Sequence, residues 1–66
     1  MHIERLVEML NDIAANQAAD PDNAVATVAQ HLKRFWDPRM RAQISAYAAE
    51  GGEGLCDTAK EAIKKL

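Results

Sequence analysis

Two aspartate–proline steps, Asp20-Pro21 and Asp37-Pro38, constrain the fold of this chain more than any other feature. Aspartate is favoured at the cap position before a helix. Proline is favoured at the first helical position, because its missing N–H would have no helical partner there. The residue before a proline is biased away from helical backbone, so an earlier helix should end close to it. The two steps therefore predict helices that begin at residues 21 and 38.

Apolar residues recur at steps of three and four on both sides of these breaks, which is typical of amphipathic helices. The pattern predicts helices over 3–18, 21–36 and 38–50, followed by a shorter helix over 55–66. No alternating run of β-branched or aromatic residues indicates a strand. The expected fold is all-α, a small bundle of three main helices plus a short C-terminal helix, in a single domain spanning 1–66.

The apolar stripes also predict the core. Leu32 and Phe35 in the second helix are expected to be buried. Their expected neighbours in the first and third helices are Leu6, Leu10, Ile13 and Ile44. Cys56 lies at the edge of the last stripe, at helical spacing from Ile63. We expect it to be a small, half-buried core residue rather than a nucleophile.

Residues near the helix ends predict three local contacts. Asp37 is placed to cap the third helix with its side chain. Gly51 is placed to take the left-handed conformation where that helix ends. In the last helix, Glu61 and Lys65 have the i,i+4 spacing of a favourable ion pair.

A core built from 66 residues is small, so chains of this length usually depend on disulfides, a metal, good helix packing or a partner. Cys56 is the only cysteine, and its spacing from His2 and His31 does not resemble a zinc site. The chain also has no glycine-rich phosphate loop and no converging set of catalytic groups. We therefore expect no catalytic, cofactor-binding or metal-binding residues on this chain, and no enzyme activity of its own.

Charged residues, Glu4 and Arg5, appear within the first five positions. No apolar run reaches the length of a signal peptide or of a membrane span. A single cysteine is also compatible with a reducing compartment. Together these features favour a cytoplasmic location and no membrane contact.

The basic residues are concentrated in segment 31–41, which holds four of the eight lysines and arginines, the only Phe and the only Trp. Its net charge is +3, whereas the whole chain carries -2. The simplest interpretation is that Phe35 and Trp36 fill the core, Asp37 caps a helix and the cations form a solvated face. In the alternative interpretation, the segment contacts another protein.

The placement of two arginines favours the second interpretation. Arg39 and Arg41 fall in the first turn of the third helix, where the positive end of the helix dipole disfavours cations. Asp37 is spaced to pair with Arg41, but Arg39 has no such compensation. A carboxylate or carbonyl of a partner would suit the planar guanidinium.

Tryptophan and arginine are enriched among interface residues that dominate binding. Beside the arginines, an exposed strip of small residues would let another protein approach the third helix closely. The strip consists of Ala42, Ala46 and Ala49. The predicted partner-binding residues are Arg34, Trp36, Arg39 and Arg41.

The whole of segment 31–41, with the run Phe35-Trp36-Asp37-Pro38-Arg39-Met40-Arg41 at its end, resembles the signature of the delta subunit of NAD-dependent, molybdenum- or tungsten-containing formate dehydrogenases. Further similar features lie along nearly the whole chain. They are Leu6-Val7 with Met9, Asn11 and Ile13, then Pro21-Asp22, Gly51-Gly52 and Gly54-Leu55.

This resemblance implies a non-catalytic subunit of an enzyme that oxidises formate to carbon dioxide and reduces NAD. Its partners would be the larger subunits, above all the catalytic one. The molybdopterin, iron–sulfur clusters, FMN and NAD would be held by those subunits. The resemblance also implies a role in assembly, stability or cofactor loading of the catalytic subunit.

Two other functions compete with this one. A sharp turn beside a basic cluster is also found in small helical nucleic-acid-binding modules, although an isoelectric point near 5.5 argues against that class. The chain could instead be a free-standing homodimer that pairs its apolar faces, so a homodimer is possible when the chain is isolated.

Overall fold

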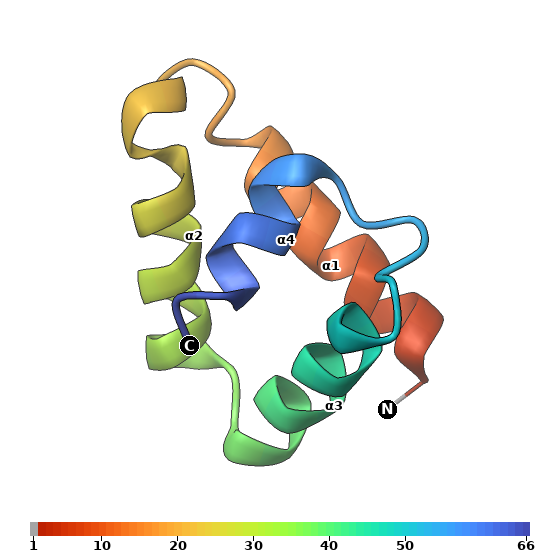
Figure 1. Ribbon diagram of the computed structural model, residues 1–66. Helices are drawn as coiled ribbons and strands as arrows, with labels where there is room; N and C mark the ends of the chain where they lie inside the picture. The colour runs from red at the N-terminus through yellow and green to blue at the C-terminus, as the bar shows by residue number, and fades with distance from the viewer. Residues whose placement is uncertain (1) are drawn as a thin grey trace.

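The computed structural model describes residues 2–66, and these form four helices with no strand among them. The helices are α1 (Ile3–Ala15), α2 (Pro21–Phe35), α3 (Pro38–Ala49) and α4 (Asp57–Ile63), as Figure 1 shows. The predicted all-α fold of three main helices and a short fourth is confirmed. Both prolines occupy the first position of their helices, as the aspartate–proline steps predicted. The first helix ends at Ala15, earlier than expected, and residues 16–19 form turns.

The short helix α4 holds the bundle together. It contacts each of the other three helices, and its most extensive contact is with α2 (Figure 1). Helices α2 and α3 make few contacts with each other although they are consecutive. The chain turns sharply after Phe35, so that α3 packs against α1 instead. The basic segment therefore lies at a corner of the molecule, where α2 ends and α3 begins.

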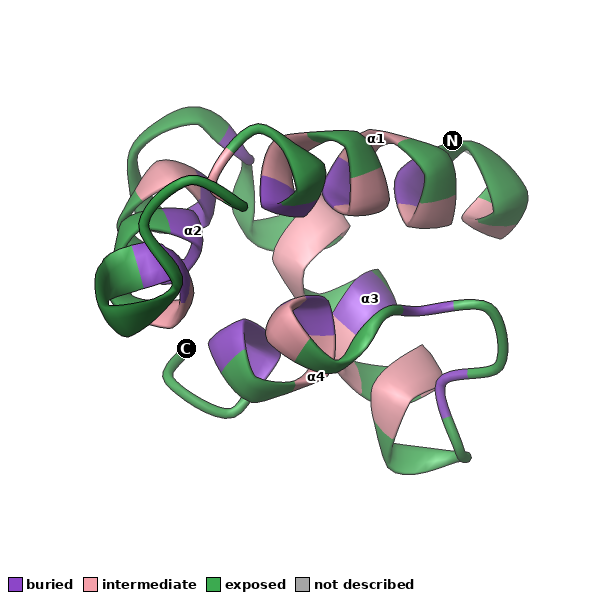
Figure 2. Ribbon diagram, turned by 90° about the horizontal axis from the view of Figure 1, so that it is seen from above, coloured by how far each residue is buried: buried purple, intermediate pink, exposed green. Residues whose placement is uncertain are grey.

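One hydrophobic cluster fills the space between the helices, and Figure 2 shows the buried positions on their inward faces. The cluster draws side chains from all four helices and from the segment before α4. Its buried members are Leu6, Leu10, Ala14, Val28, Ala29, Leu32, Trp36, Ile44, Leu55, Ala59, Ala62 and Ile63. Burial of Leu6, Leu10, Leu32 and Ile44 confirms those predictions, and Ile13 packs against the cluster while partly exposed.

The two predicted ends of α3 are confirmed. The Asp37 carboxylate accepts a hydrogen bond from the backbone N–H of Met40 at 2.9 Å, so it caps the helix. At the other end, Gly51 and Gly52 both have positive φ. Their N–H groups donate to the carbonyls of Ala48 and Tyr47, the paired bonds that close a helix in a Schellman motif.

The loop between α3 and α4 is fastened to the bundle by two side chains. Asn11 of α1 donates from its Nδ2 to the carbonyl of Gly54 at 2.8 Å, and its Oδ1 accepts from the N–H of Cys56 at 3.0 Å. The Tyr47 hydroxyl donates to the carbonyl of Glu53. These contacts fix the start of α4, and with it the position of the residues that α4 contributes to the core.

Three expectations about individual residues are wrong. Phe35 is exposed rather than in the core, because it faces away from the stripe that contains Leu32. Cys56 is exposed rather than half-buried, because α4 begins only at Asp57 and helical spacing does not apply to it. Glu61 pairs with Lys64, three residues on, at 3.2 Å rather than with Lys65.

Candidate partner-binding surface

The last turn of α2 exposes an aromatic and basic cluster. Phe35 retains 69% of its accessible surface, the largest value among the bulky apolar residues in the described part of the chain. One turn earlier, the His31 ring lies 4.7 Å from the Phe35 ring, centroid to centroid. The Arg34 guanidinium carbon lies 5.9 Å from the same ring, close enough for a weak cation–π interaction. This turn therefore presents an apolar surface and a cation side by side.

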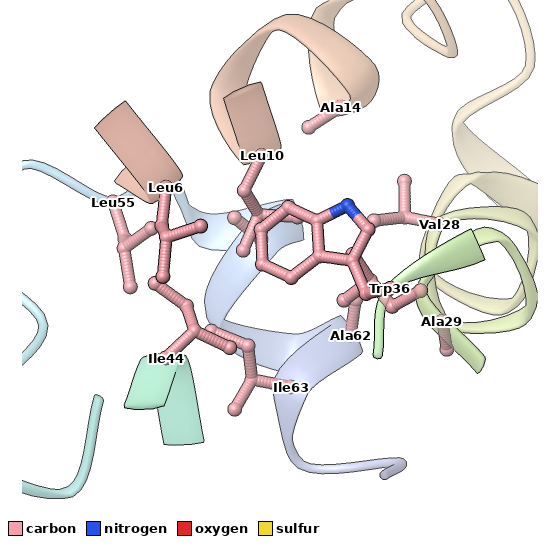
Figure 3. Close-up of a cluster of buried hydrophobic side chains, with 12 residues drawn as sticks. Leu6, Leu10, Ala14, Val28, Ala29, Trp36, Ile44, Leu55, Ala62 and Ile63 are labelled. Carbon is pink, nitrogen blue, oxygen red and sulfur yellow. The ribbon is translucent and has the colours of Figure 1, made fainter. Parts of the chain in front are cut away.

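Trp36 has the opposite environment. Only 5% of it is exposed, and Figure 3 shows its indole within the cluster formed by Leu10, Val28 and Ala62 among others. Trp36 lies four residues after Leu32 and so continues the inward face of α2, although its own backbone has already become extended. The expectation that Trp36 contacts a partner directly does not fit this burial. Phe35, its neighbour in sequence, has the exposure that such a contact requires.

Arg39 lies on the outer side of α3. It is exposed in the first turn, and the predicted strip of Ala42, Ala46 and Ala49 is exposed as well. The first turn of α3 contains no acidic side chain that could offset the positive charge of Arg39. The arginine and the alanine strip therefore form one accessible side of this helix, as the sequence predicted.

Arg41 is half-buried, and its Nε atom is buried without a hydrogen-bond partner among the described residues. The expected pairing with Asp37 does not form. Within residues 2–66, the ion pairs join Arg5 to Glu8 and Glu61 to Lys64. A buried N–H without a partner is costly. Because this Nε is enclosed by the chain's own atoms, only the partly exposed remainder of the Arg41 side chain is accessible to a partner.

The four predicted residues do not converge on one point. Arg34 lies on α2 beside Phe35, whereas Arg39 and Arg41 lie on α3, and Trp36 is inside. Arg41 lies one helical turn before Ser45, which lines a groove between α3 and α4. The structure thus distributes the arginines around the corner between α2 and α3 rather than gathering them in one pocket.

A groove that was not predicted from the sequence lies next to this corner. It has a volume of about 400 Å³ and is lined by Met9, Ile13, His31, Phe35, Trp36 and Met40, with Asp12 on the α1 side. The spacing of four from His31 to Phe35 could have predicted it. That spacing places the two rings on one outward stripe, whereas the spacing from Leu32 to Trp36 marks the inward one.

Two further observations concern the whole described chain. Residues 2–66 contain no group of three or more His, Cys, Asp or Glu side chains placed to hold a metal ion. None of the helices in the same range has the length and apolar character needed to cross a membrane.

Comparison with known protein families identified the family of this chain. A family model described as the NADH-dependent formate dehydrogenase delta subunit FdsD matches residues 5–63. The chain belongs to this family. The match confirms the resemblance that was based on segment 31–41 and its flanks. Comparison with curated proteins and with solved structures found no match.

Membership of the FdsD family bears on the use of the exposed corner between α2 and α3. A delta subunit is one component of a formate dehydrogenase complex, so this chain associates with other subunits of that enzyme. A subunit in a complex needs a surface for its neighbours. The features suited to that use are the exposed Phe35, the exposed Arg39 and the alanine side of α3.

Proposed function

We propose that this chain is a non-catalytic accessory subunit of a cytoplasmic, NAD-dependent formate dehydrogenase, and that it supports the assembly, stability or cofactor loading of the catalytic subunit. The observation that carries this proposal is the FdsD family match over residues 5–63. In this proposal the molybdopterin, iron–sulfur, FMN and NAD sites all belong to other subunits.

The catalytic subunit is the proposed direct partner. Arg34, Arg39 and Arg41 are the proposed contact residues, because each is at least partly exposed and none takes part in the ion pairs of the described chain. The helix dipole of α3 supports the choice of Arg39 and Arg41 as contact residues. Two cations in the first turn of α3 are unfavourable in isolation, and carboxylates or carbonyls of a partner would remove that cost.

The experiment compares formate dehydrogenase produced with and without this chain. The catalytic subunit is purified from both preparations, and its pterin content, its association with the flavin-containing subunit and formate-dependent NAD reduction are measured. The proposal predicts that omission lowers pterin content or complex yield per catalytic subunit. It also predicts that the activity per loaded catalytic subunit stays unchanged, because the chain supplies no catalytic group.

Equal pterin content, equal complex yield and equal activity in both preparations would contradict the accessory role. Loss of activity per loaded catalytic subunit would contradict the non-catalytic part of the proposal. The two parts are therefore tested separately by the same pair of preparations.

A further inference from the structure

Phe35 separates two hollows of different character at the end of α2. On one side is the groove of about 400 Å³ whose lining is dominated by Met9, Ile13, Trp36 and Met40. On the other is a smaller hollow of about 180 Å³ with a more polar lining, which includes Thr27, Gln30 and Arg34. Phe35 and His31 line both. We name the larger one the Phe35 groove.

The groove offers an apolar surface that the chain itself does not cover. Met9, Ile13 and Met40 pack against the core from one side and remain partly exposed on the other. Phe35 adds a ring that is 69% exposed. Single exposed apolar residues are ordinary, but a bulky aromatic ring adjoining a concave apolar surface is typical of a binding site.

The two sides of the groove differ in charge, since Asp12 lies in its lining on the α1 side and Arg34 lies beyond Phe35 on the α2 side. Arg34 lies over the Phe35 ring, and segment 31–41 carries a net charge of +3. Symmetric pairing of this face with the same face of a second copy would bring two +3 segments together, and like charges disfavour such pairing. An acidic segment would be attracted, with its carboxylates on the Arg34 side and away from Asp12.

We propose that the Phe35 groove docks an acidic segment of a larger formate dehydrogenase subunit, with an apolar side chain of that segment against Phe35 and Met40 and a carboxylate facing Arg34. This inference rests on the proposed function, since it deepens the association of the chain with its enzyme. It adds Phe35 and the groove beside it to the proposed contact residues Arg34, Arg39 and Arg41.

The test uses formate dehydrogenase prepared without this chain and immobilised through another subunit. Full-length variants are then titrated onto it. Phe35→Gln is expected to weaken binding about tenfold or more, as truncation of an aromatic interface residue does. Its melting temperature should stay close to that of the wild type, because the ring contributes little to the core. Leu66→Gln is the matched control, since Leu66 is 38% exposed and lies outside the groove, and its binding should be unchanged.

A second variant tests the charge. Arg34→Gln should weaken binding and reduce its dependence on salt, because one charged contact is lost. Phe35→Leu keeps an apolar side chain and should bind more tightly than Phe35→Gln. If both Phe35 variants bind as the wild type does, the docking inference is wrong while the proposed function stands.

Two other outcomes would overturn the docking inference: absence of binding to the enzyme, and self-association through the groove. If the wild-type chain does not bind the enzyme at all, both the docking inference and the proposed function are overturned. Sedimentation of the isolated chain addresses self-association. If the wild type forms a dimer that Phe35→Gln dissociates, and enzyme binding is unchanged, the groove takes a second copy and the docking inference is overturned.

Discussion

Replacing Trp36 by alanine tests the core directly, because Trp36 and Phe35 are neighbours with opposite exposure. Trp36 is 5% exposed. An aromatic side chain buries about 150–250 Å². At about 25 cal/mol per Å² this corresponds to about 4–6 kcal/mol. That value is an upper estimate, since the unfolded chain already covers part of this surface. Substitutions of this kind in cores cost about 3–5 kcal/mol.

A loss of that size is comparable to the whole stability of a domain this small, which is about 3–5 kcal/mol. The Trp36→Ala chain should therefore be largely unfolded at room temperature. Phe35→Ala is the matched control. Because its ring is mostly exposed, its free energy of unfolding should change by less than about 0.5 kcal/mol.

The assay is urea unfolding of the isolated variants, followed by helical circular dichroism so that loss of the only tryptophan does not remove the signal. Trp36→Phe provides an intermediate point, because it keeps an aromatic ring in the cluster. The expected order of destabilisation is Trp36→Ala, then Trp36→Phe, then Phe35→Ala. If Phe35→Ala destabilises the chain as much as Trp36→Ala does, the assignment of inward and outward faces at the end of α2 is wrong.

Three further predictions concern single contacts. Asp37→Ala should lower the stability of the chain by about 0.5–2 kcal/mol, whereas Asp20→Ala should cost less in the same thermal melts, because Asp20 makes no side-chain bond to its helix backbone. Asn11→Ala should cost about 1–3 kcal/mol and expose the loop before α4 to hydrogen exchange, because both of its loop contacts are lost. Arg39→Ala should leave the melting temperature unchanged but weaken association with the enzyme. Arg39→Lys should not restore full binding, because a point charge cannot form a two-pronged contact. Normal complex yield with an Arg39→Ala, Arg41→Ala double variant would contradict the role of these arginines in association.

The helices could be predicted from sequence because their signals are local. An aspartate followed by proline marks a start, and Gly51 followed by Gly52 marks an end, whatever the helices later pack against. The end of α1 was less predictable. Its apolar and alanine-rich pattern continues to residue 18, but the helix stops at Ala15 and the following turns lead into α2.

The faces at the end of α2 could not be assigned from the stripe alone. The sequence pattern places Leu32, Phe35 and Trp36 within one broad apolar stripe, yet the structure buries Leu32 and Trp36 and leaves Phe35 exposed. The position of α4 decides between the two aromatic rings. Helix α4 packs against α2 on the side that carries Leu32, and Ala59 and Ala62 leave room for the indole there.

The contacts of Asn11 with the loop before α4 could not be predicted from the sequence for a different reason. Asn11 meets the backbone of Gly54 and Cys56, which are more than forty positions away along the chain. No periodic pattern relates residues at such a distance. The Phe35 groove was predictable only in part, because the spacing of four places His31 and Phe35 on one stripe of α2, whereas its other walls come from α1 and the start of α3.

The most direct test of the central claim is co-purification of the tagged chain with formate dehydrogenase from cells that produce all subunits. We predict that the larger subunits elute with the chain in a fixed ratio and that the eluate reduces NAD when formate is added. Elution of the chain by itself, as a small helical protein without any larger subunit and at low as well as physiological salt, would contradict it.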